Sequence, residues 1–172
     1  MVSIQTIFVL IVLTVLPLFE LRLSVPFGII ILQTPLYILF PVIYITNIII
    51  GIIAYIVFRK FLFLIQKISF IQRYYEKYVL RVQKKIAPFV EKYGVFGVAL
   101  FISVPLPGSG VYSAAVVSDL INLSFKKFLI AILIGVFLAF CILAMLSFSF
   151  SHLLFYLGID ESKFILIQSF LE

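Results

Sequence analysis

Long apolar stretches alternate with short polar ones along the chain. Four of them, residues 1–19, 23–58, 93–118 and 128–159, carry no charged side chain. The hydrocarbon core of a bilayer is about 30 Å thick, and a helix needs roughly 20 apolar residues to cross it. Each stretch is therefore long enough to enter a membrane deeply or to cross it, and little of the chain remains for a separate soluble domain.

The second stretch predicts a full transmembrane helix over residues 35–58. Thr34 is of a type that caps helices, and Pro35 suits the first helical position because its missing N–H is not needed there. The apolar run then continues to Arg59, where the helix is expected to end. The fourth stretch is also uninterrupted and predicts a second span over residues 126–151.

The first and third stretches are broken by helix-disrupting residues. Residues 105–110 read Pro-Leu-Pro-Gly-Ser-Gly, which cannot continue a helix. The first stretch has Pro17 and the group Pro26-Phe27-Gly28. Broken backbone at membrane depth is tolerated only where it is buried in protein or lines a wet cavity. These stretches predict two re-entrant helical hairpins, over residues 4–31 and 94–121.

The two halves of the chain share this order of segments. Gly28 and Gly110 are 82 positions apart, and Gly51 and Gly135 are 84 apart. The near-constant offset predicts two repeats, each made of a hairpin and a span. Because each repeat would cross the membrane once, the repeats would be inverted, as in many secondary transporters.

A basic segment separates the repeats and bears on their topology. Residues 59–92 hold nine of the thirteen lysines and arginines, which places them in the cytoplasm. Their apolar and basic residues recur on separate helical faces, which predicts a basic amphipathic helix on the inner leaflet; a solvated connector helix is the alternative. The segment lies between repeat 1 (1–58) and repeat 2 (93–154), and residues 155–172 are expected to form a surface tail.

Two topologies are consistent with this pattern. With re-entrant hairpins, both termini lie outside and Lys126 and Lys127 lie inside. In a plain bundle of four spans, both termini lie inside and the two lysines lie outside. The excess of basic residues in cytoplasmic loops favours the hairpins.

Composition supports the membrane assignment. Of 172 residues, 65% are hydrophobic and 12% are charged, with a mean hydropathy of +1.31. Soluble domains have about 45–50% apolar and about 25% charged residues. Residues 1–19 lack the basic start and the small-residue cleavage site of a signal peptide, so we expect them to be retained. The predicted fold is an all-α, multi-pass protein of the cell membrane.

Several stretches resemble the small multi-drug export family of membrane proteins. Residues 17–22 read Pro-Leu-Phe-Glu-Leu-Arg, residues 25–28 read Val-Pro-Phe-Gly, residues 91–101 read Glu-Lys-Tyr-Gly-Val-Phe-Gly-Val-Ala-Leu-Phe, and residues 105–115 begin with Pro-Leu-Pro-Gly-Ser-Gly. The resemblance implies an exporter. A distant similarity of that family to the DedA/VTT superfamily implies flipping of lipids or polyprenyl phosphates as another activity.

Polar residues near the predicted breaks are the candidate site. Ionisable groups inside a bilayer are costly and usually face a partner or a water-filled cavity. We expect Glu20 to exchange a proton or to counter a cation, and Arg22 to hold a phosphate or carboxylate. Two positions apart on a helix, they would not face each other and would need other partners. The alternative is an interfacial charge pair that reaches the headgroups. The full set of candidates is Glu20, Arg22, Asn47, Gly108, Ser109, Gly110, Tyr112 and Asp119.

The remaining candidates have weaker roles. The N–H groups of residues 108–110, at a helix N-terminus, would favour an anion, unless this break satisfies its own backbone. Asn47 is expected to hydrogen-bond the opposite hairpin, and Tyr112 to add a polar contact. Asp119 is either a proton relay or the point at which the hairpin returns to water.

The pattern predicts a transporter and no enzyme. Residues 108–110 form neither a phosphate-binding loop nor a nucleophile elbow, and one His and one Cys define no metal site. The predicted function is a small secondary transporter or flippase, proton-coupled and without a cofactor, that moves small amphiphiles or phosphate-bearing lipids. A non-transporting scaffold or lipid-sensing protein is the alternative. The expected partners are membrane lipids and protons but no nucleic acid, and burial of the hairpins is compatible with a homodimer.

Overall fold

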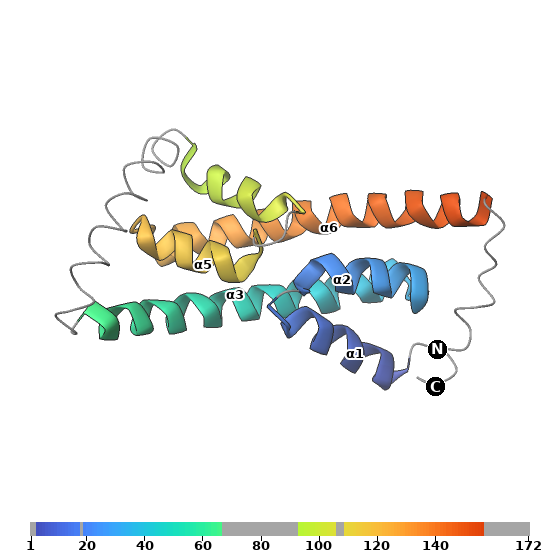
Figure 1. Ribbon diagram of the computed structural model, residues 1–172, viewed down its shortest axis with the longest axis horizontal. Coiled ribbons are helices and arrows are strands. Elements are labelled where there is room, and N and C mark those ends of the chain that lie inside the picture. The colour runs from blue at the N-terminus through green and yellow to red at the C-terminus, as the bar shows by residue number, and fades with distance from the viewer. Residues whose placement is uncertain (1–2, 18, 67–92, 106–108, 157–172) are drawn as a thin grey trace. The chain divides into compact units, whose positions relative to one another are not determined.

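The computed structural model describes residues 3–17, 19–66, 93–105 and 109–156. Within these ranges every regular element is helical, which confirms the all-α prediction there. The elements, labelled as in Figure 1, are α1 (Ile4–Val15), α2 (Glu20–Pro26), the π-helical turn η1 (Phe27–Ile31), α3 (Leu36–Gln66), a helix over Tyr93–Ser103, α5 (Val111–Leu120) and α6 (Phe125–Tyr156). The predicted basic helix and most of the predicted tail lie outside the described residues.

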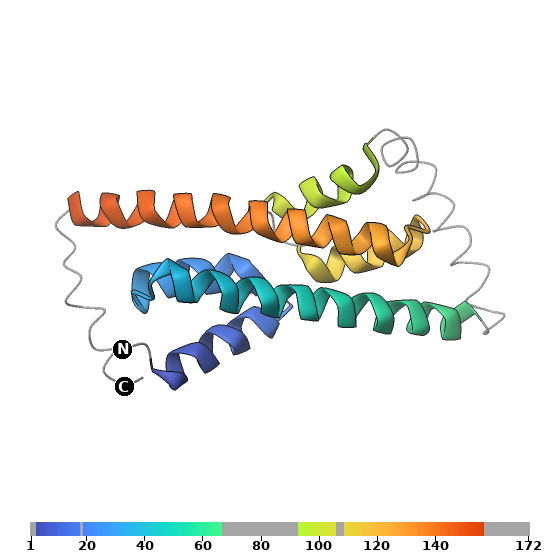
Figure 2. The ribbon, with the colours of Figure 1, turned by 180° about the vertical axis from the view of Figure 1, so that it is seen from behind.

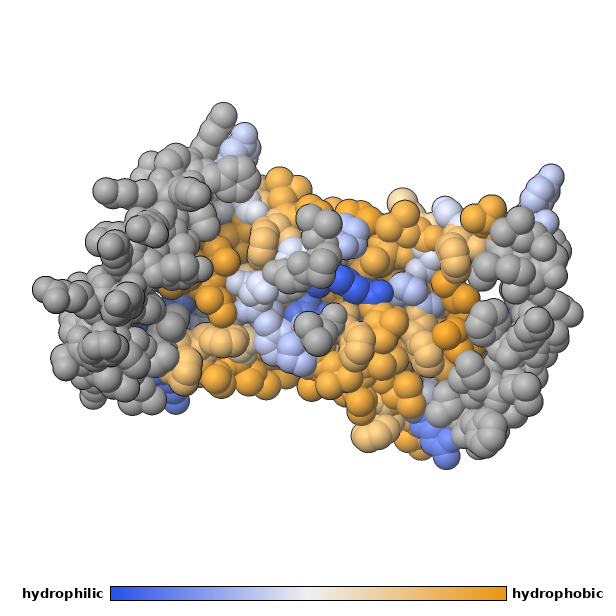
Figure 3. Space-filling view, viewed as in Figure 1, coloured by the Kyte–Doolittle hydropathy of each residue, from blue (hydrophilic) through white to orange (hydrophobic). Residues whose placement is uncertain are grey.

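The two long helices, α3 and α6, are long and apolar enough to cross a bilayer. Their candidate spans are Leu36–Phe61 and Phe125–Leu153, and only 28% and 44% of their most apolar windows are buried. The core helix of a soluble protein would be mostly buried. Orange, apolar side chains also cover most of the described surface in Figure 3. Such a surface suits lipid better than water, so the helices are compatible with a membrane protein.

Two predictions about the start and end of α3 were wrong. The hydroxyl of Thr34 is buried and has no hydrogen-bond partner among the described residues, so Thr34 does not cap the helix through its side chain. The helix also continues past Arg59 to Gln66. Arginine and lysine are good helix formers, so these charges mark the end of the apolar run and not the end of the helix.

The chain divides into two compact units that share the long helices. Unit 1 comprises residues 1–47 and 137–172, and unit 2 comprises residues 48–136. Each unit therefore contains one pair of short helices, the first part of the long helix that follows the pair, and the last part of the other long helix. We name these pairs pair 1 (α1 and α2 with η1) and pair 2 (the Tyr93–Ser103 helix and α5).

In unit 1, pair 1 is broken between the end of α1 at Val15 and the start of α2 at Glu20. The N–H of Glu20 donates to the Leu16 carbonyl at 3.0 Å across this turn. Helices α1 and α2 pack against each other, as Figures 1 and 2 show from opposite sides. The expected break at Pro26 and Gly28 is not seen, because α2 continues through Pro26 into η1. Gly28 instead permits close packing, since a Cβ there would lie 2.3 Å from Leu39 Cδ1.

In unit 2, the break in pair 2 lies where the prolines and glycines predict it. The first helix of the pair ends at Ser103, and α5 begins at Val111 after its N-cap, Gly110. Gly135 of α6 packs tightly on the first helix, because a Cβ there would lie 2.8 Å from the Ala99 carbonyl oxygen. The small residue at this position therefore allows α6 and pair 2 to approach closely.

Corresponding helices in the two halves of the chain begin 89 residues apart. Ile4 and Tyr93 begin the first short helices, and Leu36 and Phe125 begin the long ones; each pair of residues is 89 positions apart. Gln33 (φ 47°) and Asn122 (φ 53°), both in the left-handed region, have the same separation. This differs from the predicted offsets of 82 and 84, because Gly28 lies within a helical turn and Gly110 at a break.

Candidate functional site

Glu20 begins α2 directly after the turn in pair 1. It is 3% exposed, and its φ of 42° lies in the left-handed region. A non-glycine residue held in that region costs of order 1–3 kcal/mol, and such strain is concentrated at functional sites. The Ser24 hydroxyl donates to the Glu20 carbonyl oxygen at 2.7 Å, one turn further along α2. Pair 1 thus holds a buried carboxylic acid at a strained position.

Arg22 is half-buried and interacts electrostatically with Glu20. The sequence predicted that the two side chains, two positions apart, would not face each other and would need other partners. In the structure they also interact with each other. Ideal helical geometry separates positions i and i+2, but the left-handed backbone of Glu20 departs from that geometry. A buried charge is tolerated when an opposite charge lies nearby. The two residues form one electrostatic unit at the start of α2.

Asn47 lies in α3, is fully buried and belongs to unit 1. Its amide Nδ2 donates to the Ile43 carbonyl oxygen at 3.0 Å, in the same helix. Its Oδ1 has no hydrogen-bond partner among the described residues, so the expected bond to the opposite hairpin is not seen there. An unpaired buried acceptor costs about 1–3 kcal/mol, and a water or a ligand group would relieve this cost.

The break in pair 2 uses its own side chains to satisfy part of its backbone. The buried Ser109 hydroxyl donates to the Val104 carbonyl oxygen across the break. The Gly110 carbonyl oxygen accepts the first α5 bond, from Ala114 N–H at 3.0 Å. Tyr112 is half-buried in the first turn of α5. Gly108 lies outside the described residues, so the predicted anion site at 108–110 stays a prediction.

Asp119 lies at the other end of α5 and contacts the end of the α3 span. Its Oδ1 is 4.0 Å from Nε of Arg59, and the two side chains are 19% and 63% exposed. Burial raises the pKa of the Asp119 carboxyl above its usual value, and the charge of Arg59 offsets part of the rise. Asp119 thus lies beside a solvent-exposed cation, unlike Glu20.

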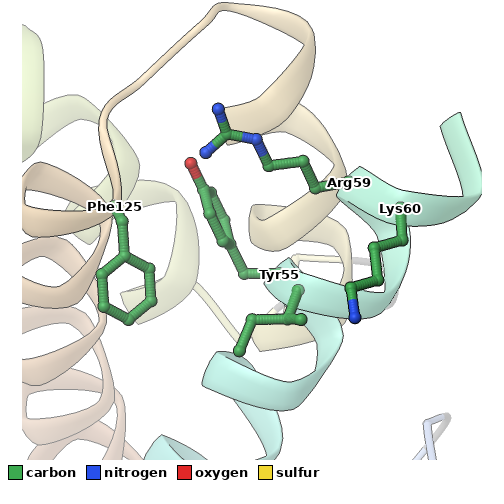
Figure 4. Close-up of a pocket in the computed structure, with 5 residues that line it drawn as sticks. Tyr55, Arg59, Lys60 and Phe125 are labelled. Carbon is green, nitrogen blue, oxygen red and sulfur yellow. The ribbon is translucent and has the colours of Figure 1, made fainter. Parts of the chain in front are cut away.

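A pocket that the sequence analysis missed lies beside this ion pair. It has a volume of about 280 Å³ and is lined by Tyr55, Ile56, Arg59, Lys60 and Phe125 (Figure 4). We call it the end pocket. Tyr55 and Arg59 are four positions apart, which places them on one face of a helix, and this spacing was the available signal. The sequence gives no signal that Phe125, from a different helix, lines the same pocket.

The candidates fall into two groups. Glu20, Arg22 and Asn47 belong to unit 1. Unit 2 contains the described candidates of the second half, which are Ser109, Gly110, Tyr112 and Asp119. No group of three or more potential metal-ligating side chains occurs in the described part of the chain.

Comparison with known proteins identifies the family. Residues 20–142 match the family described as "Putative small multi-drug export protein". The matched range begins at Glu20 and contains all of α3 and much of α6. No curated protein and no solved structure matches the chain. The family points to a transporter rather than an enzyme. Together with its two lipid-length helices, the match shows that the chain belongs to the small multi-drug export family of membrane proteins.

Proposed function

We propose that the chain is a multi-pass secondary transporter of the cell membrane, built from two inverted repeats. The antiparallel course of α3 and α6 within unit 2 supports this. Tyr55 stacks on Phe128 with ring centroids 4.7 Å apart. One turn earlier in α3, Gly51 lies against Ile132, one turn later in α6. The contacting segments of α3 and α6 therefore run antiparallel.

This antiparallel course supports the re-entrant topology over the plain four-span bundle. In a plain four-span bundle, the second and fourth spans would run in the same direction, and their adjoining basic ends would lie on opposite sides of the membrane. Instead, Phe125 at the start of α6 lies 5.5 Å from Tyr55, between ring centroids, near the end of the α3 span. The contact between Arg59 and Asp119 joins the same ends. Both contacts favour the re-entrant topology.

The lengths of the short helices support the same topology. At about 1.5 Å per residue, the 12 residues of α1 extend about 18 Å and the 10 residues of α5 about 15 Å. A bilayer core is about 30 Å thick. Each arm would therefore enter the membrane and turn back, with its broken backbone covered by the long helices.

Within this architecture, Glu20 is the proposed coupling acid. The observation that carries the assignment is its burial, at 3% exposure, in a left-handed conformation beside Arg22. A buried carboxylate takes up either a proton or a cationic group, but not both at once. Competition for one carboxylate couples inward proton movement to outward movement of a cationic amphiphile. Arg22 offsets the negative charge of Glu20 between these events and, when Glu20 is neutral, is available to a substrate phosphate or carboxylate.

The test is flux through the purified full chain in proteoliposomes. With an imposed pH gradient, the wild-type protein should export ethidium, a lipophilic cation. The gradient-driven export rate of Glu20→Gln should be at least tenfold lower than that of the wild type, because the amide cannot exchange a proton. Asp119→Asn is the matched variant, since Asp119 is the other acidic residue in the described ranges. Unchanged coupling in Glu20→Gln, or loss confined to Asp119→Asn, would refute the assignment.

A further inference from the structure

The end pocket combines rigid aromatic walls with a cationic rim. The Tyr55 hydroxyl donates to the Leu123 carbonyl oxygen at 2.9 Å, and the Tyr55 ring stacks on Phe128. These contacts fix the ring, and its hydroxyl is already used by the protein. Phe125 forms the facing wall in Figure 4. The pocket therefore presents preformed apolar surface that needs little ordering when a ligand binds.

The cations at the rim are only partly neutralised. The guanidinium carbon of Arg59 lies 6.0 Å from the Tyr55 ring centroid, and its Nε contacts Asp119 at the longest distance for an ion pair, 4.0 Å. Arg59 is largely exposed, so this pair contributes little. Lys60 is exposed, and Lys126 directly follows Phe125. Among the residues that the structure describes at this end of unit 2, positive charge therefore exceeds negative charge.

We propose that the end pocket binds an anionic phospholipid of the inner leaflet. The phosphate would pair with the Arg59 guanidinium, which lies over Tyr55 in Figure 4, while the first part of an acyl chain lies against Tyr55, Ile56 and Phe125; Lys60 adds a further positive charge to the lining. A guanidinium recognises phosphate through two parallel hydrogen bonds. Ligand sites usually occupy about 300–1,000 Å³, so a pocket of about 280 Å³ holds a headgroup region and not a whole lipid.

This lipid site shares no residue with the proposed transport site. Its residues all belong to unit 2, whereas Glu20 and Arg22 belong to unit 1. The proposal rests on the cytoplasmic position of the α3 end, which is part of the proposed topology, but not on proton coupling. Anionic lipids attract basic residues beside a membrane with about 1 kcal/mol each, equivalent to about fivefold in binding. The Asp119 carboxylate would compete with the lipid phosphate for Arg59.

The chain contains no tryptophan, which makes a clean fluorescence test possible. Phe125→Trp introduces a single reporter into the end pocket of the full chain. In vesicles that mix phosphatidylcholine with phosphatidylglycerol, bromine on the chains of one lipid at a time quenches the reporter only when that lipid is adjacent. We expect about a fivefold preference for phosphatidylglycerol. Tyr37→Trp, at the exposed start of α3, is the matched control and should show no preference.

Two further substitutions should move the preference in opposite directions. In the Phe125→Trp background, Arg59→Gln should lower it three- to fivefold, and Asp119→Asn should raise it by freeing Arg59. General damage to the fold would not produce opposite changes. Equal preference at both reporters, or no change with Arg59→Gln, overturns the proposal. Loss of the preference upon addition of free glycerol phosphate would assign the pocket to a soluble phosphate compound and overturn the lipid assignment. None of these results depends on ethidium flux, so failure of one proposal is distinguishable from failure of the other.

Discussion

Pairs 1 and 2 have the same order of elements but carry their charges at different ends. In pair 1, Glu20 and Arg22 directly follow the turn between the two short helices, and Glu20 is 3% exposed. In pair 2, residues 104–110 carry no charge, and the one acid, Asp119, lies near the far end of α5 beside Arg59. The contrast is the basis on which we propose coupling chemistry for pair 1 and lipid binding beside pair 2.

The two breaks are also built differently. Pair 2 is interrupted by a Pro-Leu-Pro-Gly-Ser-Gly sequence, which disfavours a helix. Pair 1 turns between Val15 and Glu20 and holds Glu20 in a left-handed conformation. A glutamate is a poor choice for that conformation on steric grounds alone. Its presence there is consistent with a role for its carboxylate that outweighs the local strain.

The largest expected difference between the two regions concerns their arginines. Arg22→Ala should lower the free energy of unfolding by about 2–3 kcal/mol, because it leaves Glu20 buried without its positive neighbour. Arg59→Ala should cost less than about 1 kcal/mol, since Arg59 is exposed and its ion pair is long. Denaturant titration of the purified protein in mixed micelles measures both. Equal costs would remove the contrast between a buried and an interfacial charge pair.

An intermediate effect is expected at the glycines that allow close packing. Gly135→Ala should destabilise by about 2 kcal/mol, because the added Cβ would lie 2.8 Å from the Ala99 carbonyl oxygen, which is backbone and cannot move aside. Gly28→Ala should cost only about 1 kcal/mol, since it meets the end of the flexible Leu39 side chain. Thermal unfolding of the two variants in detergent measures which substitution destabilises the protein more. A larger loss at Gly28 would show that pair 1 is the more rigidly packed.

The smallest expected effect is the pH dependence contributed by Asp119. Its pKa is raised by burial and only partly lowered again by Arg59, so the folded protein binds this proton more tightly than the unfolded chain. The resulting stabilisation is present below the pKa of the unfolded chain and is lost as the pH rises through the higher folded pKa. The stability of the wild type relative to Asp119→Asn should therefore fall slightly as the pH rises through the acidic range. A rise over the same range would mean that Arg59 dominates the environment of Asp119.

The sequence was most informative where one physical effect acts alone. Uninterrupted apolar runs predicted α3 and α6, and the clustered prolines and glycines at 105–110 predicted the break in pair 2. It was misleading where one residue type serves two purposes. Gly28 beside Pro26 resembles a break, but it is a packing position within a helical turn, so both the break and the repeat offset were displaced.

Contacts between distant segments were beyond the reach of sequence patterns. Asp119 was recognised as a site for a relay or for a return to water, but its partner, Arg59, became visible only through folding. The end pocket was missed for the same reason, since Tyr55 and Phe125 come from different helices. The Glu20 and Arg22 candidates were found because charges are rare in apolar sequence, whereas the left-handed backbone of Glu20 has no sequence signal.

The central claim is that the end of the α3 span and the start of α6 lie on the same side of the membrane. Single cysteines introduced at the exposed residues Lys60 and Asn122, after replacement of the native Cys141 with alanine, test it directly through a membrane-impermeant thiol reagent. The account predicts that neither cysteine reacts in intact cells and that both react in inside-out vesicles. Reaction of Asn122→Cys in intact cells, with Lys60→Cys protected, would place the two ends on opposite sides and contradict the account.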